Sequence, residues 1–285
     1  MKFNLPTQMK KNILIGSIIA LLVGSILWWL YGLFHVSTDD AYVNANVIQI
    51  ASRVTGPVNQ LNVVDNQYVK QGEKLFSIDP DVYAATFQRD RAAILEANAK
   101  QNIAKIIADR SVTLTQKNAM AIQDADIATS NLKSAIAQTS IATANAKISQ
   151  LNLQYTNVLA PTNGWVTNMS LRVGDIVNAN QPLFALVSDE QFWIDANFRE
   201  TDLHRIKVGD TADIKVDMYP DHHFKGVVES IRSGSGTAFS LLPPENATGN
   251  WVKVTQRVPV RVRVLNPDPK HPLRIGTSAT VTVKT

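Results

Sequence analysis

The densest group of side chains that could carry chemistry is the stretch Tyr-Pro-Asp-His-His-Phe at residues 219–224. It holds two of the five histidines, His222 and His223, beside Asp221. Imidazole and carboxylate groups are ordinary zinc ligands, and histidine can also act as a general acid or base. Adjacent residues of a strand, however, point to opposite faces, so the two imidazoles make a poor metal pair without a bend. We interpret the stretch as a solvated turn and predict no metal site.

The other candidate groups have structural explanations. Asp39 and Asp40 form a pair of carboxylates, but they stand where a strand is predicted to begin. Residues 234–237 read Gly-Ser-Gly-Thr and lack the Gly-Lys-Ser/Thr that completes a phosphate-binding loop. The chain has no cysteine, which excludes disulfides and thiolate metal sites. We therefore predict that the protein is not an enzyme and needs no cofactor.

Charge and composition are those of an ordinary folded protein. The net charge of +4 is small, and the basic residues are scattered rather than gathered into the patch that nucleic acid requires. A hydrophobic fraction of 45 % and a length of 285 residues are compatible with one or two domains. No nucleic-acid partner is predicted.

Residues 13–34 form an apolar segment without a charged side chain. As a helix it would be roughly 33 Å long, enough to cross the hydrocarbon core of a bilayer. Trp28, Trp29 and Tyr31 cluster at its end, where aromatic rings anchor a span in the headgroup layer. Three lysines precede it and two aspartates follow, so residues 1–12 should be cytoplasmic. A cleaved signal peptide is the alternative, but its apolar core would be shorter and would end in small residues.

A short β pattern occurs twice in the chain. Residues 55–78 and 163–186 align without a gap at an offset of 108 residues. Identical residues occur at five of the aligned positions: Gly56/Gly164, Val58/Val166, Val69/Val177, Leu75/Leu183 and Phe76/Phe184. Some eighty residues without this β pattern separate the two copies. We therefore assign the copies to two half-domains, residues 51–80 and 159–187.

The intervening segment, residues 81–158, contains neither glycine nor proline and is rich in alanine. From residue 121 to residue 153, small or apolar side chains recur at alternating steps of four and three, as in a close helix–helix seam. A single helix would leave this seam in water. We therefore predict an antiparallel coiled-coil hairpin that turns near residues 118–121, with arms of about 36 residues and roughly 54 Å each.

The turn of this hairpin is a candidate partner contact, because exposed apolar groups at the end of a projecting element are costly unless another surface covers them. We predict that it makes the distal contact in a ring-shaped oligomer. The residues concerned are Lys117, Asn118, Met120, Ile122 and Gln123.

The C-terminal part, residues 188–285, returns to short alternating strands separated by turn residues, which is typical of a β-barrel. The strand at 38–50 should join it. A loop rich in Gly, Ser and Pro spans residues 232–250, and loops of this length are usually functional. Its large apolar side chains are a second candidate partner contact: Phe239, Leu241 and Leu242.

The repeated unit resembles one half of a biotinyl/lipoyl domain, a flattened sandwich of two similar halves. Ile78 and Ala160 should then lie close together, and the helical hairpin occupies the place of the modifiable lysine. A lipoyl-like sandwich split by a coiled coil, behind one membrane anchor and before a barrel, is similar to the periplasmic adaptor (membrane fusion) proteins of the HlyD family. Four further segments resemble the multidrug-efflux members of that family: residues 38–50, 192–203, 234–262 and 272–283.

This resemblance implies an adaptor in the bacterial inner membrane, with one pass, a cytoplasmic N-terminus and the bulk of the chain in the periplasm. It would link a major-facilitator drug/proton antiporter to an outer-membrane channel of the TolC type, as a homo-oligomeric ring, a trimer or a hexamer. The fold class implied is mainly β with an α-helical hairpin.

Three alternatives stay open. The adaptor could serve an ABC exporter of proteins (type I secretion), or an aromatic-acid efflux pump, whose adaptors have hairpins of similar length. The third is a biotin or lipoate carrier subunit, although neither half shows a carrier lysine turn. Direct docking on a channel also stays open, because the Arg-x6-Leu-x6-Ser pattern of channel-docking hairpins is absent: Arg110 is followed seven residues later by Lys117.

Overall fold

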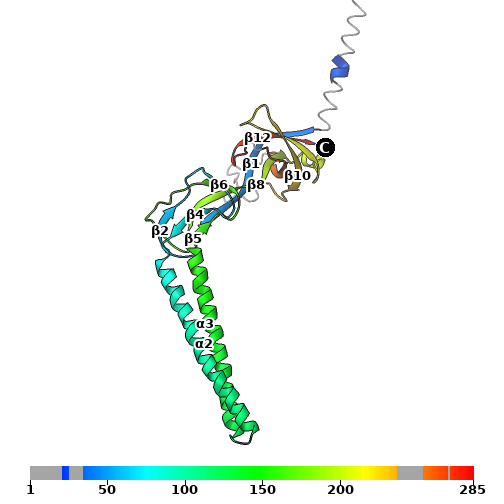
Figure 1. Cartoon of the computed structure of the whole chain (residues 1–285). Helices are drawn as coiled ribbons and strands as arrows, with labels where there is room; N and C mark the ends of the chain where they lie inside the picture. Colours follow the sequence, from blue (N-terminus) through cyan, green and yellow to red (C-terminus); the bar gives the residue numbers. More distant parts are fainter. Residues whose placement is uncertain (1–20, 26–34, 236–252, 269) are drawn as a thin grey trace, which may run out of the picture. The chain divides into compact units, whose positions relative to one another are not determined.

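The computed structural model describes residues 21–25, 35–235, 253–268 and 270–285 (Figure 1). The chain divides into two compact units. The barrel unit comprises Met1–Asn46 and Asp189–Thr285, and the sandwich unit comprises Val47–Ser188. The mainly β fold that the sequence predicts, with a sandwich, a barrel and a helical segment, is confirmed.

The barrel unit is an antiparallel ring of strands. The strands in ring order are β1 (His35–Ala51), β12 (Ser278–Lys284), β9 (Thr211–Val216), β10 (His223–Ile231), β11 (Arg257–Leu265) and β8 (Pro182–Arg199). This order follows from the hydrogen-bonded pairs, and a pairing between β1 and β8 closes the ring. A 3-10 helix, η1 (Leu203–Arg205), lies between β8 and β9.

The barrel strands form because apolar residues occupy every second position. In β11, Val260, Val262 and Val264 are buried while the arginines between them are not. Side chains of a strand alternate between its two faces, so this pattern fills the interior and keeps the charges outside. Burying each valine side chain contributes roughly 1.5 kcal/mol or more to stability.

The sandwich unit contains both copies of the repeat. One layer is a four-stranded sheet in the order β5-β4-β2-β7, and the other consists of β3, β6 and the first part of β8. These strands are β2 (Gly56–Leu61), β3 (Tyr68–Val69), β4 (Lys74–Ile78), β5 (Asn157–Leu159), β6 (Gly164–Thr167) and β7 (Ile176–Val177).

The two copies exchange strands. Gly56 of β2 in the first copy pairs with Val177 of β7 in the second, and Val69 of β3 pairs with Gly164 of β6. Each layer therefore contains strands from both copies, so neither copy can complete its sheets alone. The repeat is one domain rather than two.

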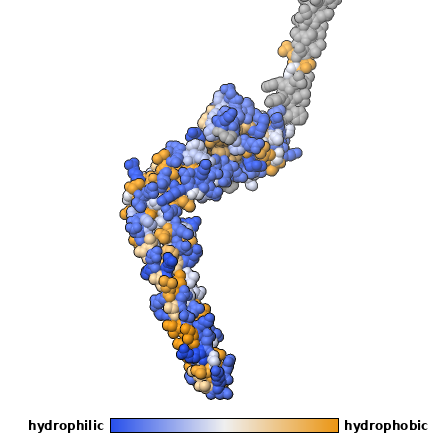
Figure 2. Space-filling model, in the orientation of Figure 1, coloured by the Kyte–Doolittle hydropathy of each residue, from blue (hydrophilic) through white to orange (hydrophobic). Residues whose placement is uncertain are grey.

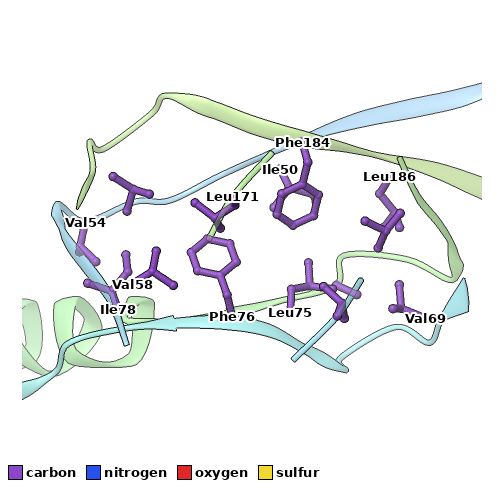
Figure 3. Close-up of a cluster of buried hydrophobic side chains, with 14 residues drawn as sticks. Ile50, Val54, Val58, Val69, Leu75, Phe76, Ile78, Leu171, Phe184 and Leu186 are labelled. Atoms are coloured by element: carbon purple, nitrogen blue, oxygen red, sulfur yellow. The ribbon is translucent and has the colours of Figure 1, made fainter. Parts of the chain in front are cut away.

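The core between the layers is made by the matched positions of the repeat (Figure 3). The rings of Phe76 and Phe184 come from opposite layers and meet edge to face, with centroids 6.1 Å apart. Val58, Leu75, Val166 and Phe184 are buried, as the repeat predicts, whereas Leu183 is partly buried.

The matched glycines are required by close approach between strands. A Cβ atom added to Gly164 would collide with the backbone carbonyl of Val187 on β8. A Cβ atom at Gly56 would lie 2.7 Å from the Cγ2 atom of Ile78, which is a side-chain atom. The first collision is with backbone, which no side-chain movement can relieve, whereas the second is with a methyl group of the buried Ile78 side chain, which yields more easily.

We expect Gly164→Ala to destabilise the protein by about 2–3 kcal/mol and Gly56→Ala by about 1 kcal/mol, because overpacking against backbone forces strands apart. Equilibrium unfolding in urea measures both values. Equal losses for the two variants would show that the β6–β8 contact yields as readily as a side chain, and would contradict this account.

The helical hairpin leaves and rejoins the sandwich at neighbouring points of one sheet. The backbone N–H of Ile78 donates to the carbonyl oxygen of Thr156 at 2.8 Å, and the N–H of Ala160 donates to the backbone carbonyl oxygen of Glu73 at 2.9 Å. The guanidinium of Arg53 lies over the ring of Tyr155, 4.8 Å from its centroid. These contacts close the base of the hairpin, with Ile78 and the segment before Ala160 side by side.

The hairpin consists of α2 (Asp81–Gln116) and α3 (Ile122–Tyr155), which lie side by side (Figure 1). Small side chains let the two backbones approach closely, and alanine also has the highest intrinsic helix propensity. We call the buried residues of this contact the alanine seam: Ala97, Ala108, Ser111, Ala125, Ala128, Ala142, Ala146 and Ser149.

The predicted membrane span at residues 13–34 lies outside the described residues except for 21–25, which are helical and exposed. Its predicted anchors Trp28, Trp29 and Tyr31 are therefore not described. Within the part of the chain that the structure describes, no helix combines the length and apolar character needed to cross a membrane.

Candidate partner interfaces

The turn of the hairpin has a defined geometry that follows from Asn118. This residue adopts a left-handed conformation with φ of 55°. Its N–H donates to Thr115, and the N–H of Ala119 donates to Leu114, each at 2.9 Å. This is the Schellman arrangement, which satisfies the last carbonyls of a helix and favours asparagine or glycine at the left-handed position. The turn is therefore a fixed element rather than a loose loop.

The five predicted contact residues all lie in the tip, residues 117–123, where α2 ends, the chain turns and α3 begins (Figure 1). Lys117, Asn118 and Gln123 are exposed. Ile122, the first residue of α3, is 71 % exposed, whereas Met120 is partly buried. The apolar surface offered at the tip is thus mainly that of Ile122.

The outer faces of both arms also expose large apolar side chains, and apolar patches are visible along the hairpin in Figure 2. Those of α2 border a shallow groove lined by Lys100, Ile103, Ala104, Ile107, Ala128 and Asn131. The sequence analysis did not predict these residues, because the heptad pattern concerns only the inner face of the hairpin. The exposed apolar side chains of the two arms include Leu95, Ile103, Ile106, Ile107, Ile127, Ile136, Ile141 and Ile148.

One carboxylate lies at the edge of the alanine seam. A hydrogen bond from Arg89, aided by one from Ser149 of the other arm, lowers the pKa of Asp90 below its ordinary value. A carboxylate whose pKa falls on folding adds stability at neutral pH, and this stability is lost as the pH falls through the folded pKa.

The second predicted contact lies outside the described residues, because these end at Ser235 and resume at Lys253. Phe239, Leu241 and Leu242 lie between these two residues, and their contact stays a prediction.

The two neighbouring carboxylates near the start of β1 have separate surroundings. Asp39 is exposed. Asp40 accepts a hydrogen bond from the side-chain amide of Asn197 at 3.1 Å and forms an ion pair with Arg257 at 3.1 Å. Asp40 thus links β1 to β8 and β11 within the barrel, which is a structural role.

The adjacent histidines point apart, as the strand argument predicts. Nδ1 of His223 lies 2.7 Å from Oδ2 of Asp213, and the other oxygen of this carboxylate, Oδ1, accepts from the ammonium group of Lys225 at 2.6 Å. Partial burial alone would raise the pKa of Asp213, but the hydrogen bonds from Lys225 and His223 lower it below its usual value. The ring of His222 instead stacks on that of His271, with centroids 4.2 Å apart.

Two family models match the two parts of the chain. The model described as RND MFP, barrel-sandwich hybrid domain, matches residues 46–189, and the AAEA-like beta-barrel domain matches residues 191–284. "Multidrug export protein EmrA" of Haemophilus influenzae is 30 % identical to the chain, covering 98 % of it and 84 % of the relative. The chain belongs to the EmrA-like membrane fusion proteins. These are adaptors rather than enzymes.

Other relatives agree with this membership. "Fatty acid resistance protein FarA" of Neisseria gonorrhoeae is 35 % identical to this membrane fusion protein, over 87 % of the chain and 75 % of the relative. Among solved structures, the membrane fusion protein Spr0693 of Streptococcus pneumoniae R6 has a TM-score of 0.64 at 18 % identity. That match covers 88 % of this membrane fusion protein and 98 % of the solved chain, and it supports the fold alone.

Proposed function

We propose that this membrane fusion protein is the periplasmic adaptor of a tripartite multidrug efflux pump. It would link an inner-membrane transporter of the major-facilitator class to an outer-membrane TolC-type channel. The observation that carries the proposal is the hairpin, which projects from the sandwich on a closed base and ends in an exposed apolar tip. An adaptor supplies reach and contact surface, and this element supplies both.

The arms are long enough to bridge a substantial gap. Thirty-six residues in α2 give a helix of about 54 Å. The alanine seam holds the second arm against the first, so the pair is stiffer than one helix in water. Proton coupling would belong to the transporter, because the predicted span at 13–34 contains no Asp, Glu, His, Lys or Arg.

We further propose a homo-oligomeric ring, a trimer or a hexamer. The exposed isoleucines on both outer faces support it, since an apolar stripe of this extent on a soluble helix usually meets another protein surface. A face of α2 on one copy against a face of α3 on the next is a head-to-tail contact, which closes into a ring when the rotation permits.

A second candidate is an adaptor for the efflux of organic acids rather than of drugs in general. The 35 % identity with a protein named for fatty acid resistance favours it, together with the short hairpin that aromatic-acid efflux adaptors share. Both candidates use the same architecture and differ only in the transporter that the adaptor joins.

Purification of the affinity-tagged full-length chain from native membranes tests the proposal. We expect a major-facilitator transporter to co-purify, and deletion of the adaptor to sensitise cells to the exported compounds. Recovery of an ABC exporter instead would assign the chain to protein secretion, and a mass spectrum showing biotin or lipoate on a lysine would make it a carrier subunit.

The topology is tested separately. Alkaline phosphatase fused after Thr285 should be active, because the lysines before the predicted span hold the N-terminus in the cytoplasm. Green fluorescent protein at the same place serves as the opposite reporter and should be dark after export through the Sec pathway. Bright fluorescence with an inactive phosphatase would reverse the orientation and with it the adaptor proposal.

A further inference from the structure

Three potential metal ligands meet in the barrel unit. His222 lies in the turn before β10, and Asp268 and His271 lie in the connection between β11 and β12. Nδ1 of His271 is 2.7 Å from Oδ2 of Asp268, and Nε2 of His222 is 3.9 Å from the same oxygen. One ligand atom from each side chain lies within 4.8 Å of the others.

Neighbouring groups orient these side chains. The ring of Phe224 packs edge-on against His222 with centroids 4.5 Å apart, and the ring of Tyr219 does the same to His271 at 5.0 Å. The hydroxyl of Tyr219 donates to the carbonyl oxygen of Pro272 at 2.9 Å, which ties the turn to the connection. These contacts keep the two imidazoles next to each other.

Hydrogen bonds orient the carboxylate of Asp268. Its two oxygens have different partners: Oδ1 accepts from the backbone N–H of Lys270 at 3.0 Å, and Oδ2 faces both histidines. The three side chains are each about one-third exposed, at 30–33 %, so a cation and a water molecule can reach them.

The spacing suits a small cation. Zinc binds imidazole nitrogen and carboxylate oxygen at about 2.0–2.2 Å, so two tetrahedral ligands lie about 3.3 Å from each other. The observed separations of 2.7 Å and 3.9 Å fall on either side of this value. The two imidazole nitrogens lie within 4.8 Å of each other, and their rings are stacked with centroids 4.2 Å apart. Binding therefore requires the rings to tilt so that their in-plane lone pairs converge on the cation, and the fourth position would stay open.

We propose that His222, Asp268 and His271 bind a divalent first-row transition cation, of which Zn²⁺ is the best match to two imidazoles and one carboxylate. Deprotonated Nδ1 of His271 would then face the cation in place of its hydrogen bond to Asp268. The bound cation would join the turn before β10 to the connection before β12. The proposal differs from the sequence expectation of no metal site, and it does not depend on the exported compound.

Zinc titration of the full-length protein in detergent tests the proposal. The protein carries no polyhistidine tag and is first stripped with a chelator. Competition with a chromophoric zinc indicator should show one Zn²⁺ per chain. His222→Ala, His271→Ala and Asp268→Asn should each weaken binding by roughly tenfold or more, because each removes a ligand. The thermal unfolding midpoint should rise with Zn²⁺ in the unaltered protein.

His223→Ala is the matched control, since it removes the adjacent histidine, whose ring faces Asp213 rather than the cluster. Its zinc affinity should equal that of the unaltered protein. Asp268→Asn preserves the side-chain shape, so it tests the site even if a histidine variant fails to fold. An unaltered protein that binds no zinc would overturn the proposal. Binding retained in the double variant His222→Ala/His271→Ala would also overturn it.

Discussion

Substituting lysine for Ile122 should abolish drug resistance while leaving the adaptor folded and bound to its transporter. Ile122 is 71 % exposed at the distal end of the hairpin, far from the sandwich core. A lysine there costs little in the free protein, because the ammonium stays in water. In an apolar contact the same charge would be buried without a partner, which weakens the binding free energy of an interface by several kcal/mol.

Resistance in a deletion strain complemented with each variant measures the effect, and co-purification with the transporter checks assembly. Ser130→Lys is the matched control, because it adds the same charge to an exposed position on α3 outside the tip. Met120→Lys should also abolish resistance, although its partly buried side chain makes a folding defect a competing cause. If Ile122→Lys cells export normally, the tip does not dock, and the hairpin serves only to hold protomers together.

Phe184→Ala should destabilise the sandwich by about 3–5 kcal/mol, the usual cost of removing a buried phenyl ring from a core. Phe184 is 3 % exposed and meets Phe76 edge to face across the two layers. Its loss leaves a cavity between strands that come from both copies of the repeat, so neither layer can collapse without moving the other.

Urea denaturation of the full-length protein gives this free energy. Ile176→Ala in β7 is the control, because its side chain is 74 % exposed and its removal should change stability by less than about 0.5 kcal/mol. A Phe184→Ala variant that unfolds within 1 kcal/mol of the unaltered protein would mean that the aromatic pair is peripheral to the core.

Much of the sandwich could be predicted because the two copies of the repeat have the same residue types at positions with the same packing requirement. Gly56 and Gly164 match since each lies where a neighbouring strand leaves no room for a Cβ atom. Phe76 and Phe184 match since they fill the same core from opposite layers. The exchange of strands between the copies could not be predicted, because matching positions identify equivalent residues but not which copy supplies the pairing partner.

The hairpin could be predicted for a different reason. A segment without glycine or proline and with small residues at heptad spacing has few alternatives to paired helices. Asn118 even marks the turn, because asparagine tolerates the left-handed conformation that ends α2. The heptad spacing predicts only the seam between the helices, so it did not predict the exposed isoleucines on their outer faces.

The histidine cluster could not be found by local reasoning. His222 meets Asp268 and His271, which lie 46 and 49 residues further along the chain, outside any regular strand or helix. No periodicity links such positions, so only the barrel topology brings them together. The neighbouring His223, which the sequence offers as a partner, faces Asp213 instead.

Because the base of the hairpin is closed by its own hydrogen bonds, the length of the helices is independent of the sandwich. The bond between Ile78 and Thr156 holds the two ends together however many helical turns lie beyond them. Removing seven residues from each arm, at equal distances from Asn118, would shorten the hairpin by about 10 Å and keep the seam in phase. The reach of the hairpin could thus be changed by adding or deleting matched heptads, without altering a single residue of the sandwich.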